Sequence, residues 1–369
     1  MAGAAKLTNV VQERALLVQA IVGRQDRQQA QDSLEELERL ADTAGAVVIG
    51  SLAQHRQRPT PKYLIGEGKL EEIKMACQQA NANLVIFDND LTPMQVNNLD
   101  QALGIKVIDR TEVILQIFAR RARSAEAQIQ VELAQLQYLV SRLPVSEKQP
   151  RFSGGIGMKG PGESPLKLRN EPMRRRIRDL QRKLETIQAR RSQTRARRAY
   201  PSVSLVGYTN AGKSTILNTL SAADAYVDDR LFATLDTKTR LVRLPNGREV
   251  LLTDTVGFIR HLPHGLVASF RSTLDEVRES DLLLHVADAS HPHVQDHCAV
   301  VFDTLAEIGA QDVKQVLVFN KCDRPEARAA LPDLLRMFPE AVAVSALQSD
   351  GLDPLRQRLA AALRSRNES

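Results

Sequence analysis

A glycine-rich loop follows a short apolar segment in the C-terminal half of the chain. Residues 202–206 alternate and then become apolar, as a buried strand does, and the sequence GYTNAGKST follows at once. Its spacing fits GxxxxGKS, in which backbone amides face phosphates, the lysine reaches the outer phosphates and the serine hydroxyl meets Mg²⁺. The sequence therefore predicts a phosphate-binding loop between a strand and a helix of an α/β fold. Its expected binding residues are Gly207, Tyr208, Thr209, Asn210, Ala211, Gly212, Lys213, Ser214 and Thr215.

Length and composition indicate a globular chain of more than one domain. The 369 residues are enough for about two domains of the usual ~100 to 200 residues, and 43% of them are hydrophobic. No apolar run approaches the ~20 residues of a spanning helix, and the polar start MAGAAKLTNVVQER lacks the order of a secretory signal. Cys77, Cys298 and Cys322 are too far apart for a zinc pattern or a disulfide framework. We expect a cytoplasmic monomer with no membrane span.

Positive charge is concentrated in one stretch. The formal net charge is +6, yet residues 165–200 contain 13 Lys and Arg against 3 Asp and Glu. Clustered basic residues release counterions when they neutralise phosphates, so this stretch favours contact with RNA. The alternative is a solvated helical surface.

The pattern of apolar residues divides the chain into three regions. From Arg14 to Arg110, apolar and amphipathic segments alternate, which predicts a small α/β domain with a parallel sheet. From Thr111 to Leu143, apolar residues at three- and four-residue spacing predict one long helix. A glycine-rich loop separates it from a second, basic helix, Pro172 to Arg198, so that the two form an antiparallel pair. The predicted domains are 1–110, the helical hairpin 111–200 with its loop at 153–163, and a P-loop domain, 201–369.

The third region predicts a mixed, mostly parallel sheet. Residues 239–244 and 248–253 are strand-like, and the Asn246-Gly247 pair between them is a turn signal for an antiparallel hairpin. Strand and helix then alternate to the end of the chain. One antiparallel strand on a parallel sheet is a common form.

Two motifs downstream of the loop restrict which nucleotide the site can bind. Asp254-Thr255-Val256-Gly257 follows an apolar strand, so that Asp254 can hold the Mg²⁺ shell and the Gly257 amide can approach the γ-phosphate. Asn320-Lys321-Cys322-Asp323 follows another apolar run. The Asp323 carboxylate can accept from the N1–H and 2-amino groups of guanine, which adenine does not offer together. Such a pair discriminates by about 1 to 3 kcal/mol.

Two further segments complete the predicted site. Phe232-Ala233-Thr234-Leu235-Asp236 is the expected first switch, in which the Thr234 hydroxyl binds Mg²⁺ and its amide lies near the γ-phosphate. Thr237 and Thr239 are alternatives for that role. Ser345-Ala346-Leu347 would add a backbone amide at guanine O6. The expected catalytic residues are Asn210, Lys213, Thr234 and Gly257, and the expected Mg²⁺ residues are Ser214, Thr234 and, through its outer shell, Asp254.

The order of these motifs resembles the Obg and HflX group of translational GTPases. FATLD together with DTVGFIRHLPHGLVASF is similar to HflX, as are GEGKLEEI at residues 66–73 and the loop GGIGMKGPGE. The resemblance covers nearly the whole chain and favours Thr234 over its two neighbours. Two features differ from the usual family pattern: the linker reads GMKGPGESPLKLRN where GTRGPGET is usual, and the extra C-terminal domain of longer members is expected to be absent.

The resemblance implies a GTPase that binds GTP and GDP and acts on the large ribosomal subunit. In that family the N-terminal domain and the helical pair reach rRNA, and the protein helps to split or rescue stalled ribosomes. Some members are also reported to hydrolyse ATP through the N-terminal domain. An RNA-binding adaptor with incidental hydrolysis and an ATP-dependent RNA-remodelling enzyme are the alternatives.

Two residues bear on how GTP is hydrolysed. Phe258 follows DTVG, where Ras-like GTPases keep a water-orienting glutamine, and a phenyl ring cannot bind the attacking water. We therefore expect slow intrinsic hydrolysis and an external stimulator. Asn210 matches the position that in similar GTPases helps to hold K⁺ beside the phosphates, although it can also simply cap the loop.

Two weaker candidates for sites are present. His291, His293 and His297 form the only histidine cluster, and without matching carboxylates or cysteines a surface position at a helix start is the better interpretation. Lys62, Gly66 and Lys69 could contact phosphate, but a surface loop explains them as well.

Overall fold

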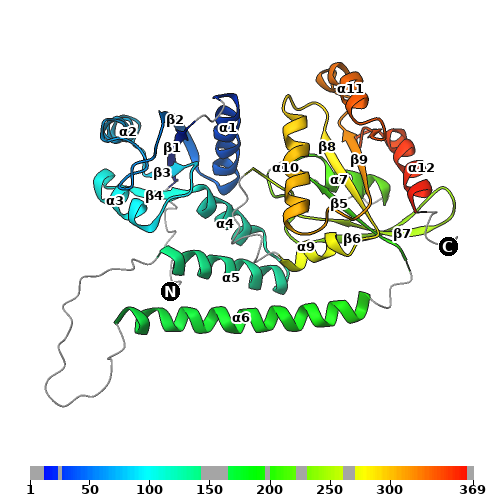
Figure 1. The fold of residues 1–369 in the computed structure, drawn as a ribbon, viewed down its shortest axis with the longest axis horizontal. Helices are drawn as coiled ribbons and strands as arrows, with labels where there is room; N and C mark the ends of the chain where they lie inside the picture. Colours follow the sequence, from blue (N-terminus) through cyan, green and yellow to red (C-terminus); the bar gives the residue numbers. More distant parts are fainter. Residues whose placement is uncertain are drawn as a thin grey trace, which may run out of the picture. The chain divides into compact units, whose positions relative to one another are not determined.

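The computed structural model describes residues 12–23, 27–142, 165–195, 200–221, 231–260 and 271–363. The chain forms two compact units, one of residues 1–117 and 139–164 and the other of residues 118–138 and 165–369. The glycine-rich loop at 153–163 and the HLPHGLVASF segment lie outside the described residues. Each unit contains one sheet (Figure 1).

The first unit is the expected β/α alternation. All its strand pairs are parallel, in the order β2-β1-β3-β4, which confirms the prediction for residues 14–110. The central strand β1 carries an almost unbroken run of buried residues, as strands covered on both faces do. The elements are β1 (Arg14–Val22), α1 (Arg27–Ala44), β2 (Val47–Arg56), α2 (Glu67–Ala80), β3 (Leu84–Phe87), α3 (Pro93–Leu103) and β4 (Lys106–Asp109).

Local sequence explains where α3 begins. The Thr92 side chain accepts from the Gln95 amide, and the Gln95 side chain accepts from the Thr92 amide, which is a capping box. Pro93 occupies the first turn, where its missing N–H is not needed. At the other end Gly104 has a φ of 71°, which glycine adopts without strain.

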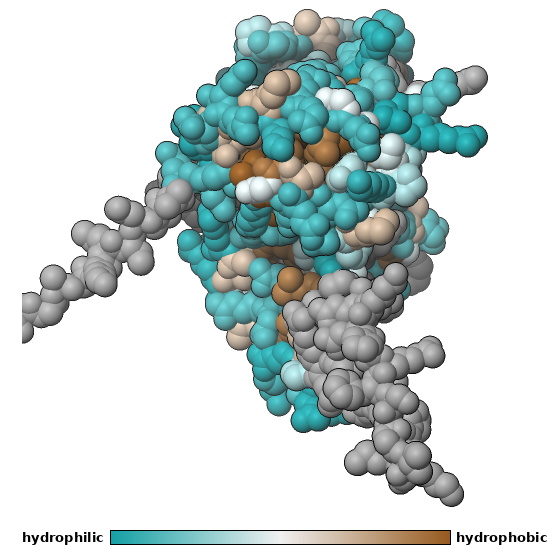
Figure 2. Space-filling view, turned by 90° about the vertical axis from the view of Figure 1, so that its left-hand side faces the viewer, coloured by the Kyte–Doolittle hydropathy of each residue, from teal (hydrophilic) through white to brown (hydrophobic). Residues whose placement is uncertain are grey.

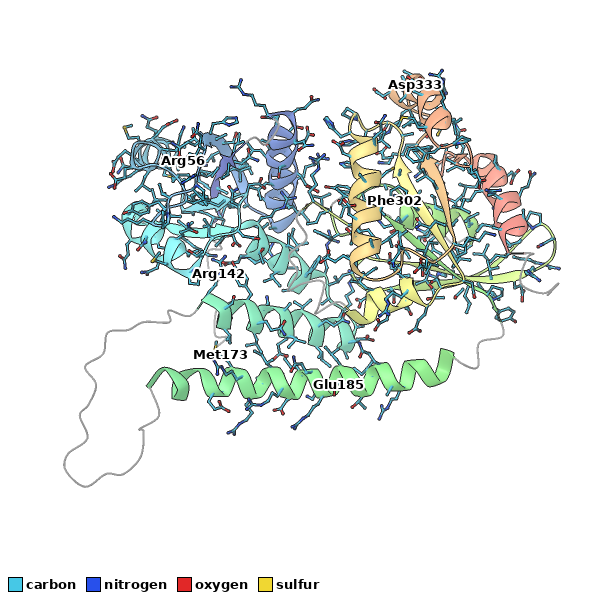
Figure 3. All side chains as sticks on the ribbon, in the orientation of Figure 1. Arg56, Arg142, Met173, Glu185, Phe302 and Asp333 are labelled. Carbon is cyan, nitrogen blue, oxygen red and sulfur yellow. The ribbon has the colours of Figure 1, made fainter. Side chains whose placement is uncertain are left out.

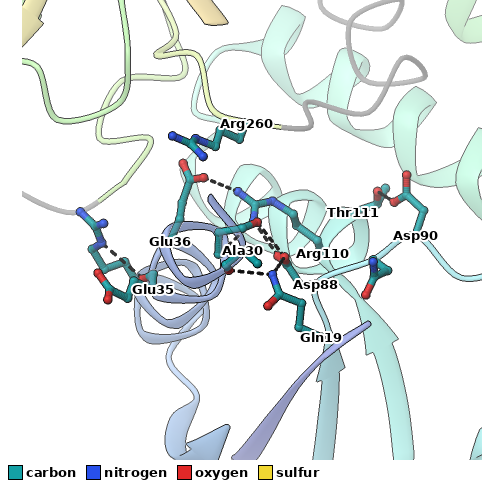
Figure 4. Close-up of polar contacts among 12 residues, drawn as sticks. Gln19, Ala30, Glu35, Glu36, Asp88, Asp90, Arg110, Thr111 and Arg260 are labelled. Atoms are coloured by element: carbon teal, nitrogen blue, oxygen red, sulfur yellow. Dashed lines mark hydrogen bonds and ion pairs between the residues drawn. The ribbon is translucent and has the colours of Figure 1, made fainter. Parts of the chain in front are cut away.

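A buried ion network lies at the carboxyl end of β3 and β4 (Figure 4). Arg110 is 1% exposed, and its guanidinium donates to Asp88 at 2.7 Å and to Glu36 at 2.5 Å. The second Asp88 oxygen accepts from Gln19 at 2.9 Å and from Ser33 at 2.7 Å. The network therefore joins β1, α1 and the residues directly after β3 and β4.

The prediction of one long helix over residues 111–143 is wrong, because two helices occupy this region. Helix α4 (Arg110–Arg121) ends before Ser124, and α5 (Ala125–Arg142) begins after it. The Ser124 hydroxyl accepts from the Ala127 amide at 3.1 Å, as an N-cap does. Apolar spacing continues across the break, so periodicity could not reveal it.

Helix α6 (Pro165–Arg195) is the predicted basic helix, but it begins earlier than expected. Pro172 lies inside it and does not start it. In the second unit α6 runs antiparallel to α5 (Figure 1), with Leu180 and Leu184 packed against Leu133. Arg176 adds a bidentate pair to Glu132, at 2.6 and 2.8 Å. This packing confirms the antiparallel helical pair.

The second sheet is mixed, in the order β10-β9-β8-β5-β7-β6. Only the β6–β7 pair is antiparallel among its described pairs, which confirms the predicted hairpin. Its elements are β5 (Ser202–Gly207), α7 (Lys213–Leu220), β6 (Lys238–Arg243), β7 (Glu249–Asp254), α9 (Arg271–Arg278), β8 (Leu282–Asp288), α10 (Val294–Glu307), β9 (Gln315–Asn320), α11 (Pro325–Met337), β10 (Val342–Ala343), the 3₁₀ turn η1 (Ser349–Leu352) and α12 (Asp353–Ala362).

Helices cover both faces of this sheet. Val203 and Leu205 of β5 belong to a core with α7 and α12, whereas Val206 belongs to a core with α9 and α10. Alternate residues of a strand point to opposite faces, so one strand supplies both cores. The α/β fold with a mixed, mostly parallel sheet is confirmed.

The face seen in Figure 2 is largely hydrophilic, with a few hydrophobic residues showing between the polar ones. Within the described residues, no helix is both long and apolar enough to span a bilayer.

Candidate nucleotide-binding site

A pocket of about 340 Å³ opens at the carboxyl end of the second sheet. Strands β5, β7 and β9 end there, and ligands of such sheets bind beyond the carboxyl ends of the strands. It is lined by Thr209, Asn210, Gly212, Lys213, Ser214, Thr215, Phe232, Ala233, Thr234, Thr255, Gly257, Asn320, Lys321, Asp323, Arg324, Ala346 and Leu347.

The phosphate-binding loop connects β5 to α7. Lys213 is 6% exposed and donates to the carbonyl oxygens of Gly207 at 3.0 Å and Tyr208 at 2.8 Å. Burial lowers the pKa of Lys213 to about 8; the Asp254 charge opposes this shift and the Lys321 charge adds to it. A phosphate placed here would meet a cation that water solvates poorly, which strengthens its attraction for an anion.

Two glycines allow the backbone to come this close. Gly212 has a φ of 94°, and a Cβ there would lie 2.1 Å from Asn320 Nδ2. A Cβ on Gly257 would lie 2.8 Å from Thr209 Cα and 3.0 Å from Lys213 Nζ. Side chains at these positions would push the loops around the pocket apart.

Oxygen ligands suited to Mg²⁺ meet at one end of the pocket. Asp254 Oδ2 accepts from Ser214 Oγ at 2.6 Å and from Thr234 Oγ1 at 2.9 Å, and the two hydroxyls are 2.8 Å apart. Asp254 Oδ1 is buried without a hydrogen-bond partner among the described residues. Burial raises the pKa of Asp254, against the Lys213 charge and the hydrogen bonds from Ser214 and Thr234. Hard oxygen donors around an unsatisfied carboxylate fit a magnesium ion.

Thr234 is the threonine that the fold brings to this point. Thr239, one alternative, lies in β6, where its hydroxyl contacts Thr253 at 2.9 Å. Of the other predicted switch residues, Phe232 and Ala233 line the pocket, whereas Leu235 is buried and Asp236 bonds outside it.

Phe258 does not face the nucleotide pocket. Its side chain is 2% exposed and packs in the core that contains Val206 and Leu274. Its amide donates to Gly207 O at 3.1 Å, and its carbonyl accepts from the Thr209 amide at 2.8 Å. The backbone of Phe258 is thus hydrogen-bonded to the phosphate loop. Its side chain has no polar group that could bind a water at the γ-phosphate.

The base end of the pocket is built by Asn320 and its neighbours. The Asn320 side chain donates to Ala211 O at 2.9 Å and accepts from the Ala346 amide at 3.1 Å, so it joins the phosphate loop to the 345–347 loop. Ser345 donates to Asp323 Oδ1 at 2.6 Å, which orients that carboxylate. Lys321 pairs with Asp288 at 2.6 Å. These contacts explain why three separated motifs meet at one edge of the sheet.

Nine predicted residues do not line the pocket. Cys322 donates its amide to Val344, and Tyr208 stacks on the His297 ring at 3.8 Å. Arg324, which sequence reasoning missed, does line the pocket. Its only sequence signal was its place directly after Asp323. The nine are Gly207, Tyr208, Ala211, Leu235, Asp236, Asp254, Val256, Cys322 and Ser345.

The weaker candidates fall elsewhere. His291 and His297 have ring centroids 4.2 Å apart near the start of α10. In the first unit, Lys62 lies over the Tyr63 ring at 4.6 Å and Lys69 pairs with Glu72 at 2.7 Å. Gly66 precedes α2 and donates its amide to Gln54.

Comparison with known proteins agrees with this geometry. Three family models match in succession: the GTP-binding GTPase N-terminal model over residues 31–119, the GTP-binding GTPase middle region over 121–198, and the 50S ribosome-binding GTPase model over 202–321. A GTPase HflX of Caldanaerobacter subterraneus subsp. tengcongensis is 46% identical over 353 residues, which are 93% of this chain and 79% of the relative.

The chain belongs to the HflX family of GTPases. The GTPase HflX of Escherichia coli K12 is 45% identical over 320 residues, 85% of this chain and 74% of that protein. The crystal structure of a complex of SsGBP with GDP matches with a TM-score of 0.53 and 26% identity, over 95% of this chain and 98% of that chain. Family membership confirms the resemblance inferred from the motifs.

As an HflX family member, the chain is a GTP-hydrolysing enzyme with a P-loop GTPase fold. P-loop GTPases use Mg²⁺, and Ser214, Thr234 and Asp254 would hold it here. Mg²⁺ held there would supply positive charge against the negative charge that develops on the phosphates during transfer. The structure itself shows a buried Lys213 at the phosphate loop and a glycine at 257 that leaves the space beside Thr209 and Lys213 free of a side chain.

Proposed function

We propose that the chain binds the large ribosomal subunit and couples GTP binding and hydrolysis to splitting or rescue of ribosomes. The observation that carries this proposal is the basic surface of α6. Arg174, Arg175, Arg182 and Lys183 are all exposed on this helix, and Figure 3 shows side chains projecting from the side of α6 that faces away from α5. A row of exposed cations on one helix suits a phosphate backbone. The match of residues 202–321 to a family described as 50S ribosome-binding GTPases supports the same partner.

We further propose that GTP hydrolysis is slow until a partner stimulates it. The buried Phe258 ring leaves no side chain there to orient water. Asn210 lines the pocket and has a φ of 60°, and we propose that it helps to hold K⁺ beside the phosphates. Such a cation would supply the charge that an arginine finger supplies elsewhere. Equal subunit-stimulated GTP turnover in K⁺ and in Na⁺ would contradict this role.

The decisive experiment is single-turnover hydrolysis of GTP and ATP, with and without purified large subunits. We expect subunits to accelerate GTP turnover in the wild type and to have no effect in Lys213→Ala. Tight subunit binding without faster GTP turnover would instead favour an adaptor with incidental hydrolysis. The buried Phe258, which cannot orient water, is also consistent with that alternative. ATP turnover that survives Lys213→Ala would point to a separate site in the N-terminal unit.

A second experiment tests the basic helix directly. Arg174→Glu/Arg182→Glu should weaken subunit binding and lower the slope of log affinity against log salt by about one per lost phosphate contact. The matched control, Arg328→Glu/Arg336→Glu on α11, changes as many exposed arginines and should leave binding unchanged. If both variants weaken subunit binding equally, the attraction between the protein and the subunit is non-specific and does not depend on α6.

A further inference from the structure

The break between α4 and α5 is held by a carboxylate from a distant part of the second unit. Asp236 Oδ2 accepts from the backbone amide of Arg123 at 2.9 Å and from that of Ser124 at 3.2 Å. Asp236 Oδ1 accepts from the Ser124 hydroxyl, which in turn accepts from the Ala127 amide. A residue 112 positions away in the chain thus completes the cap of α5.

The same two backbone amides could form the hydrogen bonds of a continuous helix instead. In a continuous helix the N–H groups of Arg123 and Ser124 would donate to the carbonyls of Ala119 and Arg120, four residues earlier. The apolar spacing across the break is that of one helix. Asp236 therefore replaces two intrahelical hydrogen bonds, and its negative charge is stabilised at the N-terminus of an 18-residue helix.

Asp236 is also two residues from the Mg²⁺ end of the pocket. Thr234 bonds to Asp254 and Ser214, and Leu235 between them is 4% exposed. On the other side of Thr234, Phe232 packs edge-on against Phe118 of α4, with ring centroids 4.7 Å apart. The segment 232–236 is therefore anchored at the nucleotide site in its middle and at the α4–α5 junction at both ends.

We propose that Asp236 is a positioning residue that couples the nucleotide state to the α4–α5 break. While Thr234 is held beside the γ-phosphate, Asp236 keeps the amides of Arg123 and Ser124 out of the helix. When Thr234 is released, Asp236 leaves with it and those amides return to helical bonds. By reciprocity, whatever holds the break open also holds Thr234 in its GTP-binding position.

Nucleotide preference tests this coupling without ribosomes. Asp236→Ala should weaken a non-hydrolysable GTP analogue relative to GDP by about five-fold or more, the lower end of typical coupling between sites. Asp236→Asn, which keeps one acceptor oxygen and the side-chain shape, should show part of the change. Thr92→Ala removes the comparable cap of α3 in the first unit and should not alter the ratio. A purely structural role predicts lower thermal stability of Asp236→Ala with an unchanged ratio, and that result would overturn the proposal.

The backbone amide signal of Ser124 gives a second, local readout. In protein labelled with ¹⁵N-serine, the signal can be assigned by its loss in Ser124→Ala. It should differ between the GDP and GTP-analogue complexes of the wild type and coincide in the two complexes of Asp236→Ala. A Ser124 signal with the same position in both wild-type complexes would show that the break does not respond to nucleotide. Because neither measurement involves ribosomes, failure here leaves the ribosome proposal untouched, and the reverse also holds.

Discussion

The two sheets place charged residues at their carboxyl ends in opposite ways. In the first, Arg110 is enclosed by Asp88 and Glu36, and all three side chains are no more than 6% exposed. In the second, Lys213 and Asp254 are just as deeply buried, but Lys213 bonds only backbone carbonyls among its described hydrogen-bond partners and one Asp254 oxygen has no partner among the described residues. In the first unit the buried charged groups bond one another, whereas in the second unit Lys213 lines a pocket.

The difference shows how similar topology produces a structural unit or a binding site. A buried ion pair offsets its own desolvation only when its charged groups are close and hydrogen-bonded, and both terminal nitrogens of Arg110 donate to carboxylates. A buried cation that is only partly balanced by opposite charge has a lowered pKa, as Lys213 does. An anion that binds beside it stabilises its charged form. The contrast predicts that variants in the two places will separate stability from binding.

The largest expected effect is on stability, from Arg110→Met. Removal of the guanidinium leaves Asp88 and Glu36 buried without their cation, which costs about 3 to 5 kcal/mol of unfolding free energy. Urea unfolding of the variant measures this loss. The triple variant Arg110→Met/Asp88→Asn/Glu36→Gln removes all three charges and should recover most of it. If the triple variant is as unstable as the single one, the network does not act through paired charge.

Lys213→Ala should produce the reverse pattern. Hydrogen bonds to charged groups contribute about 1.5 to 3 kcal/mol each, so GTP affinity should fall roughly 10- to 150-fold. Stability without nucleotide should not fall, because the lost contacts are to carbonyls of the same loop and the buried charge of Lys213 itself disfavours folding below pH 8. Calorimetric titration with GTP and thermal unfolding together give the two numbers. Thermal destabilisation as large as that of Arg110→Met would contradict the comparison.

Asp323→Asn should change which base is bound. An amide can donate to the exocyclic oxygen of xanthine, whereas the carboxylate accepts from the 2-amino group of guanine. The expected shift in preference from GTP towards XTP corresponds to about 1 to 3 kcal/mol. Competition binding with GTP, XTP and ATP measures it. The control is Asp333→Asn on the exposed side of α11, which should leave the preference unaltered.

The smallest expected effect is a dependence of GTP affinity on pH. Lys213 has a pKa of about 8 here, and bound phosphates would raise it, so the complex holds more protons than the separate protein above pH 8. Affinity should therefore be greatest below pH 8 and fall by at most tenfold per pH unit as the pH rises beyond it. Titrations between pH 7 and 9 test this fall.

The same group affects stability with the opposite sign. Its pKa in the unfolded chain is near 10.5, so between pH 8 and 10.5 the unfolded chain holds more protons and the contribution of Lys213 to stability rises with pH. Lys213→Arg stays charged throughout this range and is the matched control for both titrations. A wild-type affinity curve that parallels that of Lys213→Arg would assign the fall to guanine or to another group.

Much of the fold could be predicted because its signals are local. Periodicity of 2 and 3.6 residues distinguished strands from helices, and Asn246-Gly247 located the antiparallel hairpin. The phosphate loop could be found because its glycines, lysine and serine are contiguous. By contrast, Arg324 lines the pocket without any pattern, and Phe258 was judged by its chemistry although its ring points into the core.

The sequence by itself determined which groups can bind a guanine nucleotide, because short motifs with fixed spacing carry their own backbone geometry. It also determined the two α/β sheets, since burial follows the periodicity of each element. The motifs favoured Thr234 over Thr239 only through a family resemblance, and the tertiary structure brings Thr234 to Asp254 and shows that α4 and α5 are separate helices. Both outcomes depend on hydrogen bonds between residues far apart in the chain, of which Asp236 with Ser124 is the clearest case. Local periodicity holds no information about such partners.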